Sequence, residues 1–268
     1  MLISATPSGQ RYNVEARGKG EALALLHGFS GAASTWDSIA EELADDFQLV
    51  LIDLLGHGAS DAPRDTARYR MESVAADIVD LLDKLGVAKP HLLGYSMGGR
   101  LALFLALRYP TRIPSLILES ASPGLAGERA QARRRQHDNI LAEKIEARGI
   151  SWFVDYWERR PLWASQSDEQ IGRQRSQRLA NNPLGLANCL RAMGAGAQPN
   201  LWGALPSLAL PTCLIVGERD AKFRQINQAM RATIPNSRLT IIPAAGHNTH
   251  LEQPAAFCRA LRSFMDCV

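Results

Sequence analysis

The sequence of 268 residues is poor in cysteine: it has four, at positions 189, 213, 258 and 267. They form no C-x-x-C pair and no cysteine–histidine spacing suited to a metal, so we expect no metal site and no other cofactor. So few cysteines also exclude a disulfide-stabilised scaffold, and we expect reduced thiols in a cytoplasmic protein. Cys213 stands in an apolar run and is predicted to be a core residue.

Long apolar runs are also missing. No segment approaches the roughly 20 apolar residues that a membrane-spanning helix needs, and the first ten residues lack the basic start and apolar centre of a signal peptide. A net charge of +3 is too small to indicate nucleic-acid binding. Internal repeats and low-complexity segments are absent as well. We therefore expect a globular protein with neither a membrane nor a nucleic acid as partner.

The small positive charge is unevenly distributed. Residues 121–200 contain 12 Lys and Arg against 8 Asp and Glu, and eleven of these 12 basic residues are arginine. The rest of the chain has 18 basic against 19 acidic residues. The positive surplus therefore lies in one segment.

Apolar patterning predicts an α/β fold. Apolar runs predict strands at 12–16, 22–26, 49–53, 91–93, 116–119, 212–217 and 239–242, and helical periodicity lies between them. This alternation predicts a mostly parallel central sheet flanked by helices. From Ser122 to about Leu205 only helical patterns occur, at 126–148, 151–159, 167–181 and 184–193. We therefore predict a core of residues 1–121 and 206–268 with an inserted helical lid of residues 122–205.

The central motif is Gly94-Tyr95-Ser96-Met97-Gly98, a G-x-S-x-G pattern between a predicted strand and a predicted helix. In that context the serine stands on a turn too tight for bulky neighbours, and the glycines remove the side chains that would clash. The positive end of the following helix favours an anion at the same place. Ser96 is therefore predicted to be a catalytic nucleophile.

A catalytic serine needs a base and an acid that orients the base. Asp220 and His247 each follow a predicted strand, where catalytic groups collect in open α/β sheets. The order Ser96, Asp220, His247 is the chain order of α/β-hydrolases. Glu119, which also ends a strand, remains the serious rival to Asp220 as the acid.

The other histidines are weaker candidates for the base. His57 stands between two glycines and is predicted to be a turn residue, and His27 is predicted to pack structurally. His91 lies in a predicted strand and His137 on a predicted lid helix. His250 lies three residues past His247, the better candidate. For an oxyanion hole, two backbone N–H donors are needed. We predict those of Met97, which follows the serine, and of Phe29, in a glycine-bearing loop.

Several stretches carry a family resemblance. The sequence is similar to α/β-hydrolase-fold proteins from end to end in His27-Gly28-Phe29, the serine motif and Gly246-His247. It resembles more narrowly the 2-succinyl-6-hydroxy-2,4-cyclohexadiene-1-carboxylate synthases of menaquinone biosynthesis. The stretches that carry this second resemblance are 99–100, 118–125 with the arginines that follow, 153–157 and 217–223.

The resemblance implies a lyase that removes pyruvate from 2-succinyl-5-enolpyruvyl-6-hydroxy-3-cyclohexene-1-carboxylate. The triad would then abstract a proton beside the succinyl ketone instead of transferring an acyl group. The substrate carries three carboxylates, so its pocket should be cationic. Arg100, one helical turn after Ser96, suits bidentate carboxylate binding.

The resemblance also implies substrate contacts in the lid. At most one or two of its clustered arginines should reach the pocket, because a charge run on a helix usually faces solvent. We favour Arg133 or Arg134, and allow for a shift of one residue in the match to the family's pattern. Arg178 matches a further arginine that binds substrate in the family. Tyr95, Tyr156 and Trp157 match aromatic pocket positions, whereas Trp152 and Trp163 are assigned to packing.

Two other functions stay open at this point. The same triad would serve a carboxylesterase or a C–C bond hydrolase, and the fold would also serve a catalytically silent binding protein. An intact set of Ser96, Asp220 and His247 argues against the silent protein. Only the arginines and the family resemblance favour the lyase over a hydrolase. The partner is expected to be a small polycarboxylate, and the protein a monomer or a small homo-oligomer.

Overall fold

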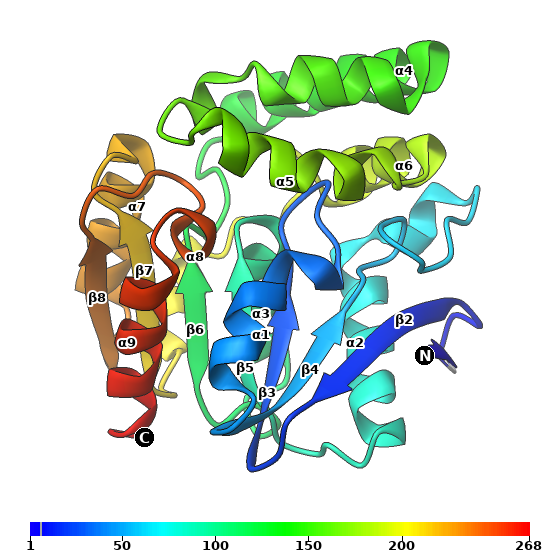
Figure 1. The fold of residues 1–268 in the computed structure, drawn as a ribbon. Helices are drawn as coiled ribbons and strands as arrows, with labels where there is room; N and C mark the ends of the chain where they lie inside the picture. The colour runs from blue at the N-terminus through cyan, green and yellow to red at the C-terminus, as the bar shows by residue number, and fades with distance from the viewer. Residues whose placement is uncertain (6) are drawn as a thin grey trace.

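An eight-stranded sheet forms the centre of the computed structural model, which describes residues 1–5 and 7–268 (Figure 1). The strand order is β1-β2-β4-β3-β5-β6-β7-β8; β1 and β2 pair antiparallel with their neighbours, and β3 to β8 run parallel. The strands are β1 (Leu2–Ser4), β2 (Arg11–Arg17), β3 (Glu21–Leu26), β4 (Phe47–Ile52), β5 (His91–Tyr95), β6 (Leu116–Glu119), β7 (Thr212–Gly217) and β8 (Ser237–Ile242).

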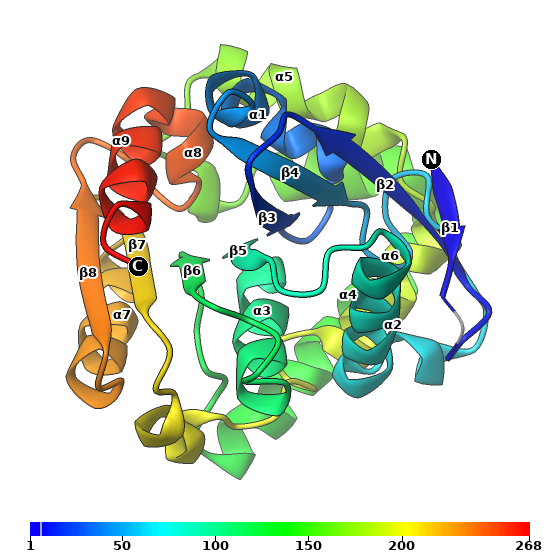
Figure 2. The same ribbon diagram turned by 90° about the horizontal axis from the view of Figure 1, so that it is seen from below.

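Helices cover both faces of this sheet, so its inner strands are buried as continuous apolar runs. Figure 2 shows α1 (Asp37–Leu43), α8 (Thr249–Glu252) and α9 (Pro254–Met265) on one face. The opposite face carries α2 (Met71–Lys84), α3 (Met97–Arg108) and α7 (Ala221–Thr233). Each face has its own cluster of buried apolar side chains, and the sheet separates the two clusters.

The segment between β6 and β7 contains no strand among its residues, all of which are described. It folds into α4 (Glu128–Glu158), α5 (Asp168–Leu179) and α6 (Pro183–Met193), which lie across the carboxyl edge of the sheet (Figure 1). Helices α4 and α6 bury a third apolar cluster that includes Leu141, Phe153 and Leu186. The predicted break between two helices at Gly149 appears as a kink inside α4, where Gly149 has φ +80°.

The predicted strands and helices are present, with ends shifted by a few residues. The shortest elements carry too little periodicity to be read from the sequence: β1, α8 and the 3₁₀ turns η1 (Ala33–Trp36), η2 (Thr66–Tyr69), η3 (Pro161–Trp163) and η4 (Trp202–Ser207). The four cysteines are unpaired, and only Cys267 is exposed. Among the described residues no helix is both long and apolar enough to cross a membrane.

The turn from β5 into α3 brings backbone against backbone. A Cβ on Gly98 would lie 2.1 Å from the carbonyl oxygen of Leu26 at the end of β3, and a Cβ on Gly94 would lie 2.4 Å from the carbonyl oxygen of Gly98. Neither neighbour is a flexible side chain that could move aside. Glycine at both positions therefore permits the approach of α3 to the sheet that puts Ser96 on the turn.

This contact predicts a sharp difference between two glycine variants. Gly98→Ala should lower the free energy of unfolding by about 3 kcal/mol, because strand and helix backbones must separate. Gly172→Ala is the matched control: this glycine lies in α5 with nothing within 4 Å of an added Cβ. It should raise the free energy of unfolding by about 0.5–1 kcal/mol. Urea denaturation measures both, and equal effects would contradict the close approach at Gly98.

Candidate active site

The structure brings the three predicted triad residues together at the carboxyl edge of the sheet. Ser96 lies between β5 and α3 with φ 50° and ψ −104°, and its N–H donates to the Glu119 carbonyl oxygen at 2.8 Å. The His247 Nε2 atom lies 3.0 Å from the Ser96 Oγ atom. The His247 Nδ1 atom lies 2.7 Å from Asp220 Oδ2. Serine, base and acid thus form one hydrogen-bonded chain.

Asp220 is held by the helix that it begins. It is the N-cap of α7, and its Oδ1 atom accepts the Phe223 N–H at 3.2 Å while Oδ2 contacts the histidine. A carboxylate at Nδ1 favours the tautomer with the proton on that nitrogen, which leaves Nε2 free to accept the Ser96 proton. His247 is 3% exposed, so bulk water does not compete strongly for this bond.

Glu119, the rival acid, has other partners. Its carboxylate accepts the Thr249 hydroxyl at 2.7 Å, the His250 N–H at 3.0 Å and lies 2.6 Å from His250 Nδ1. All three groups are buried. Glu119 therefore anchors the segment just after His247 to the strand beside the nucleophile, whereas Asp220 contacts His247 itself.

Three of the remaining histidines are buried, and the fourth, His137, is exposed and lines the cavity described below. His27 and His57 are buried with ring centroids 5.1 Å apart. Burial lowers the pKa of both, that of His57 to about 3, so neither is charged at neutral pH. His91 contacts the Ser115 hydroxyl at 2.7 Å, and His137 is exposed, 3.9 Å from Asp138.

A cavity of about 950 Å³ opens between the triad and helices α4 and α6. Ser96, His247, Phe29 and Met97 line it from the core. Met97 is the first residue of α3, a position whose N–H has no partner within the helix. Both predicted oxyanion donors thus belong to residues that line the same space as the Ser96 hydroxyl.

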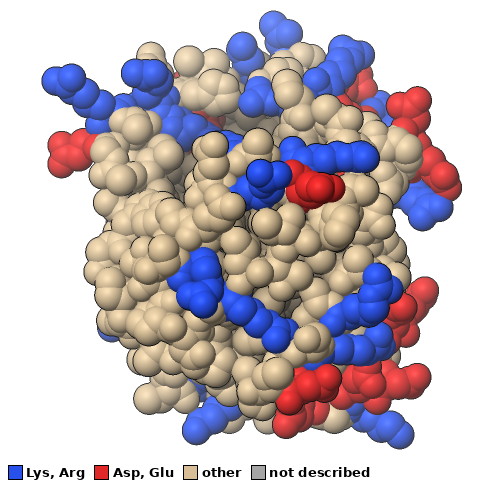
Figure 3. Space-filling model, turned by 90° about the vertical axis from the view of Figure 1, so that its left-hand side faces the viewer, with Lys and Arg blue, Asp and Glu red and all other residues tan. Residues whose placement is uncertain are grey.

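The lining of this cavity is strongly basic. It contains Arg100, Arg129, Arg133, Arg134, Arg160 and Lys222, and the single acidic residue in it is Asp138. Arg134 pairs with Asp138 at 2.8 Å, so that the acid offsets one of the six cations. On the face drawn in Figure 3, basic side chains also gather at the lid end. A ligand that offset the positive charge of this cavity would carry several negative charges.

Arg100 is the cation nearest the serine in sequence, and it is half-buried. Its Nη1 atom donates to the Met193 carbonyl oxygen at 3.0 Å and to Gln198 Oε1 at 3.3 Å, both of which are neutral. Burial, and then the neighbouring charge of Arg134, lower the pKa of Arg100 to about 10. A carboxylate bound here would recover the solvation that this guanidinium has lost.

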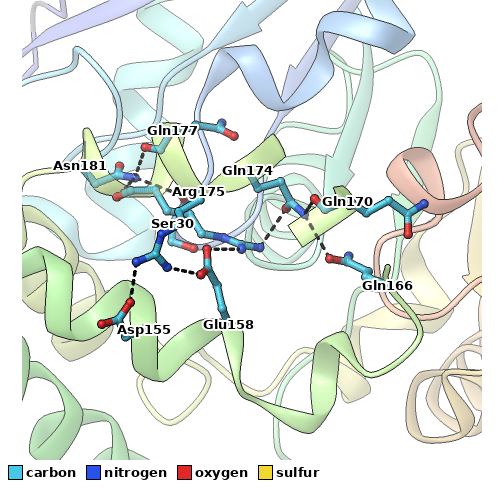
Figure 4. A network of polar contacts seen from close by, with 10 residues as sticks. Ser30, Asp155, Glu158, Gln166, Gln170, Gln174, Arg175, Gln177 and Asn181 are labelled. Atoms are coloured by element: carbon cyan, nitrogen blue, oxygen red, sulfur yellow. Dashed lines mark hydrogen bonds and ion pairs between the residues drawn. The ribbon is translucent and has the colours of Figure 1, made fainter. Parts of the chain in front are cut away.

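Two expected contact residues lie outside the cavity lining. The Arg178 guanidinium is 3% exposed and donates to Glu158 Oε1 at 3.1 Å and to Gln174 Oε1 at 3.0 Å. It belongs to the polar network between α4 and α5 that Figure 4 shows around Glu158 and Gln174. The Tyr156 hydroxyl accepts from Arg160 at 2.5 Å, and its ring stacks on Trp152. These lid contacts, which the sequence does not reveal, occupy both side chains.

Tyr95, Trp157 and Arg133 do line the cavity, as expected. Trp163, which we assigned to packing, lines it as well, with its ring centroid 6.2 Å from that of His247. Of the clustered arginines, Arg129, Arg133 and Arg134 all line the cavity, which is more than the one or two that we expected. Four other lining residues had no site role predicted from the sequence: His137, Arg160, Trp202 and Lys222. Lys222 carried a usable signal, since it stands two residues after the triad acid at the carboxyl edge of the sheet.

Comparisons with known proteins agree with this geometry. The alpha/beta hydrolase fold family matches residues 21–254. A solved structure of MenH from S. aureus superposes with a TM-score of 0.90 and is 36% identical, covering 95% of this chain and 97% of that one. A malate-bound thermophilic esterase from Thermogutta terrifontis superposes with a TM-score of 0.87 at 31% identity, covering 99% of this chain and 97% of its own. The chain is therefore an α/β-hydrolase-fold protein.

Two curated relatives narrow the assignment. A Bacillus subtilis (strain 168) protein, provisionally named a 2-succinyl-6-hydroxy-2,4-cyclohexadiene-1-carboxylate synthase, is 42% identical over 97% of this chain and 96% of its own. A Salmonella paratyphi C (strain RKS4594) protein that bears the name of this synthase is 35% identical over 91% of this chain and 93% of its own. Within the fold, this chain belongs to the 2-succinyl-6-hydroxy-2,4-cyclohexadiene-1-carboxylate synthase family.

Removing the charge of Asp220 should slow the reaction of Ser96 far more than removing the charge of Glu119. Asp220→Asn should slow the reaction of Ser96 with a fluorophosphonate about 10³-fold or more, because the amide favours the wrong histidine tautomer. Glu119→Gln keeps the size and an acceptor oxygen, and should slow that labelling by no more than about 10-fold. The labelling rate of each purified variant measures this. The reverse ranking would identify Glu119 as the acid of the triad.

Proposed function

We propose that this protein is a lyase that converts 2-succinyl-5-enolpyruvyl-6-hydroxy-3-cyclohexene-1-carboxylate into 2-succinyl-6-hydroxy-2,4-cyclohexadiene-1-carboxylate and pyruvate, a step of menaquinone biosynthesis. The observation that carries the proposal is a complete serine triad at the bottom of a cavity lined by six basic side chains and one acidic side chain. The family membership supports the same reaction. The proposed substrate has three carboxylates, which suits this excess of positive charge.

The two compounds differ by the positions of the ring double bonds and by the enolpyruvyl group. A proton leaves C2, beside the succinyl ketone, and the ring double bond moves from C3–C4 to C2–C3. A second double bond forms between C4 and C5 as the C5–O bond breaks and enolpyruvate departs with the electron pair. Enolpyruvate then takes up a proton and becomes pyruvate. The enzyme has to accept one proton and stabilise one enolate.

The triad suits both tasks. In our proposal His247, oriented by Asp220, withdraws the Ser96 proton, and the Ser96 oxygen removes the proton at C2. The geometry supports it, since the Ser96 Oγ atom lies 3.0 Å from His247 Nε2. Negative charge develops on the ketone oxygen, where the N–H groups of Phe29 and Met97 would hold it. No cofactor takes part in this scheme.

The cationic lining would place the substrate. We propose that Arg100 binds a carboxylate next to the serine, with Arg133 and Arg134 binding from the lid and Tyr95 and Trp157 packing against the ring. Arg178 would act indirectly, by holding α5 against α4 through Glu158. Tyr156 would act through its contacts with Trp152 and Arg160. Arg100 is half-buried, donates hydrogen bonds to neutral acceptors and has no ion pair with an acidic side chain among the described residues, which supports its assignment most directly.

We further propose that residues 122–205 form the lid over a core made of residues 1–121 and 206–268. Support comes from the separate apolar cluster of α4 and α6, which lies over the carboxyl edge of the sheet. The four unpaired cysteines are consistent with a reaction in the cytoplasm. Whether the protein is a monomer or a small homo-oligomer stays a prediction of the sequence.

The first test is pyruvate release from the enolpyruvyl substrate, measured beside hydrolysis of a simple aryl ester. The wild-type protein should release pyruvate far above the spontaneous rate and hydrolyse the ester poorly. Ser96→Ala should lower the rate of pyruvate release about 10³-fold or more, because the proton acceptor is gone. Rapid ester cleavage with no pyruvate would instead make the protein a hydrolase on this fold.

A second test concerns the charge of Arg100. Arg100→Gln should raise KM for the tricarboxylate about 10-fold to 100-fold, because a hydrogen bond between charged groups contributes about 1.5–3 kcal/mol. Arg108→Gln, at the exposed end of the same helix, is the matched control and should leave KM unchanged. Steady-state kinetics of pyruvate release distinguish the two. An unchanged KM in Arg100→Gln would remove this residue from the proposed binding set.

A further inference from the structure

The loop that carries Phe29 is held in an unfavourable backbone conformation. We define residues 27–31 as the oxyanion loop. Its turn is closed by the Gly31 N–H, which donates to the Gly28 carbonyl oxygen at 3.0 Å, and Ser30 takes φ +64°. A side chain disfavours this left-handed region, so contacts from outside the loop have to maintain it. The direction of the Phe29 N–H depends on this turn.

One lid side chain meets this loop by hydrogen bonds to its backbone. Asn181, just past the end of α5, is 3% exposed. Its Nδ2 atom donates to the Ser30 carbonyl oxygen at 3.1 Å and to the Gln177 carbonyl oxygen at 3.1 Å, and Figure 4 shows these three residues together. Its Oδ1 atom accepts the Gly58 N–H at 3.0 Å. The amide orientation follows, because the opposite one would set oxygen against both carbonyls.

Gly58 extends this contact to a second loop. The segment of residues 54–60 packs beside the oxyanion loop: the Leu54 N–H donates to His27 Nε2 at 3.0 Å. The His57 ring meets the Phe29 ring edge-on with centroids 5.7 Å apart. Asn181 therefore ties together the two loops that fix Phe29 on the core side.

The lid also touches Phe29 directly. Phe153 and Trp157 of α4 contact its ring edge-on at centroid distances of 5.8 and 5.4 Å. Aromatic contacts limit where the ring lies, but they make no hydrogen bond to the backbone of the turn at Ser30. Among the described lid residues, the side-chain hydrogen bond to the carbonyl of Ser30 comes from Asn181.

We propose that Asn181 is a positioning residue that holds the oxyanion loop in the conformation in which Phe29 N–H serves the reaction. The inference rests on the proposed function, in which that N–H stabilises the enolate. Since the enolate forms only after the proton has left C2, Asn181 acts on the transition state and not on substrate affinity. Its loss therefore lowers kcat and leaves KM near its wild-type value.

The chain offers a matched control in the next residue. Asn182 is also an asparagine with a structural hydrogen-bonding role, because its Oδ1 atom accepts the Leu184 and Gly185 N–H groups and caps α6. Asn181→Ala should lower kcat for pyruvate release about 10-fold and leave KM within about twofold of wild type. The expected loss is smaller than the loss caused by removing an oxyanion donor, because the donor is displaced and not removed. Asn182→Ala should lower the unfolding midpoint and leave kcat within about twofold of wild type.

A third variant tests which bond matters. Asn181→Asp preserves the size and the acceptor for Gly58 N–H, but sets an oxygen against the Ser30 carbonyl, so it should be as slow as Asn181→Ala. A wild-type kcat in Asn181→Asp, or equal kcat values in Asn181→Ala and Asn182→Ala, would overturn the proposal.

The rate at which a fluorophosphonate labels Ser96 is measured in parallel. That reaction uses the same oxyanion donors and should also slow about 10-fold in Asn181→Ala. If the wild-type protein released no pyruvate, the proposed function would fail, while the labelling rates would still decide the role of Asn181. Labelling of Asn181→Ala at the wild-type rate would show that the oxyanion loop does not need this side chain.

Discussion

The structure depends on the approach of α3 to the sheet without any side chain between them. Gly98 lies against the backbone of Leu26, and Gly94 lies against the backbone of Gly98. This contact lets the chain leave β5 and enter α3 within one residue, so that Ser96 takes its positive φ at the carboxyl edge of the sheet. The helix start then supplies the Met97 N–H, and the end of the adjacent β3 leads into the loop that carries Phe29. The position of the serine and those of the two proposed oxyanion donors thus follow from one backbone contact.

Around this turn, buried polar side chains fix parts of the chain that belong to no strand or long helix. Glu119 holds the segment after His247, and Glu252 accepts the N–H groups of Gly246 and Asn248 on either side of that histidine. Asn181 does the same for the loops near Phe29. Each uses a side chain to satisfy backbone groups that the loop cannot satisfy internally. The precision of a catalytic loop therefore comes from residues that take no part in the chemistry.

The basic residues that line the cavity favour the proposed reaction over that of a hydrolase with the same triad. The proposed lid, residues 122–205, contributes four of the six basic residues of the cavity, and the proposed core contributes Arg100 and Lys222. Some lid arginines are neutralised within the lid, as Arg178 is by Glu158 and Arg134 by Asp138. Others have no acidic partner among the described residues and remain available to an anion, Arg133 and Arg160 among them. The count of arginines in the sequence therefore overstates the charge that a substrate meets.

The sequence by itself determined the fold, the order of its elements, and the serine and histidine of the triad. Apolar runs reveal buried strands. A serine between glycines at the end of one strand, with an acid and a histidine at the ends of later strands, is typical of a serine triad at the edge of a parallel sheet. The choice between Asp220 and Glu119 was made by tertiary structure, because both end strands and only distance to His247 separates them. Tertiary structure also decided which lid residues face the cavity. The lid helices are charged on several sides, and the partner of each arginine depends on how α4, α5 and α6 pack together, which no local pattern of residues records.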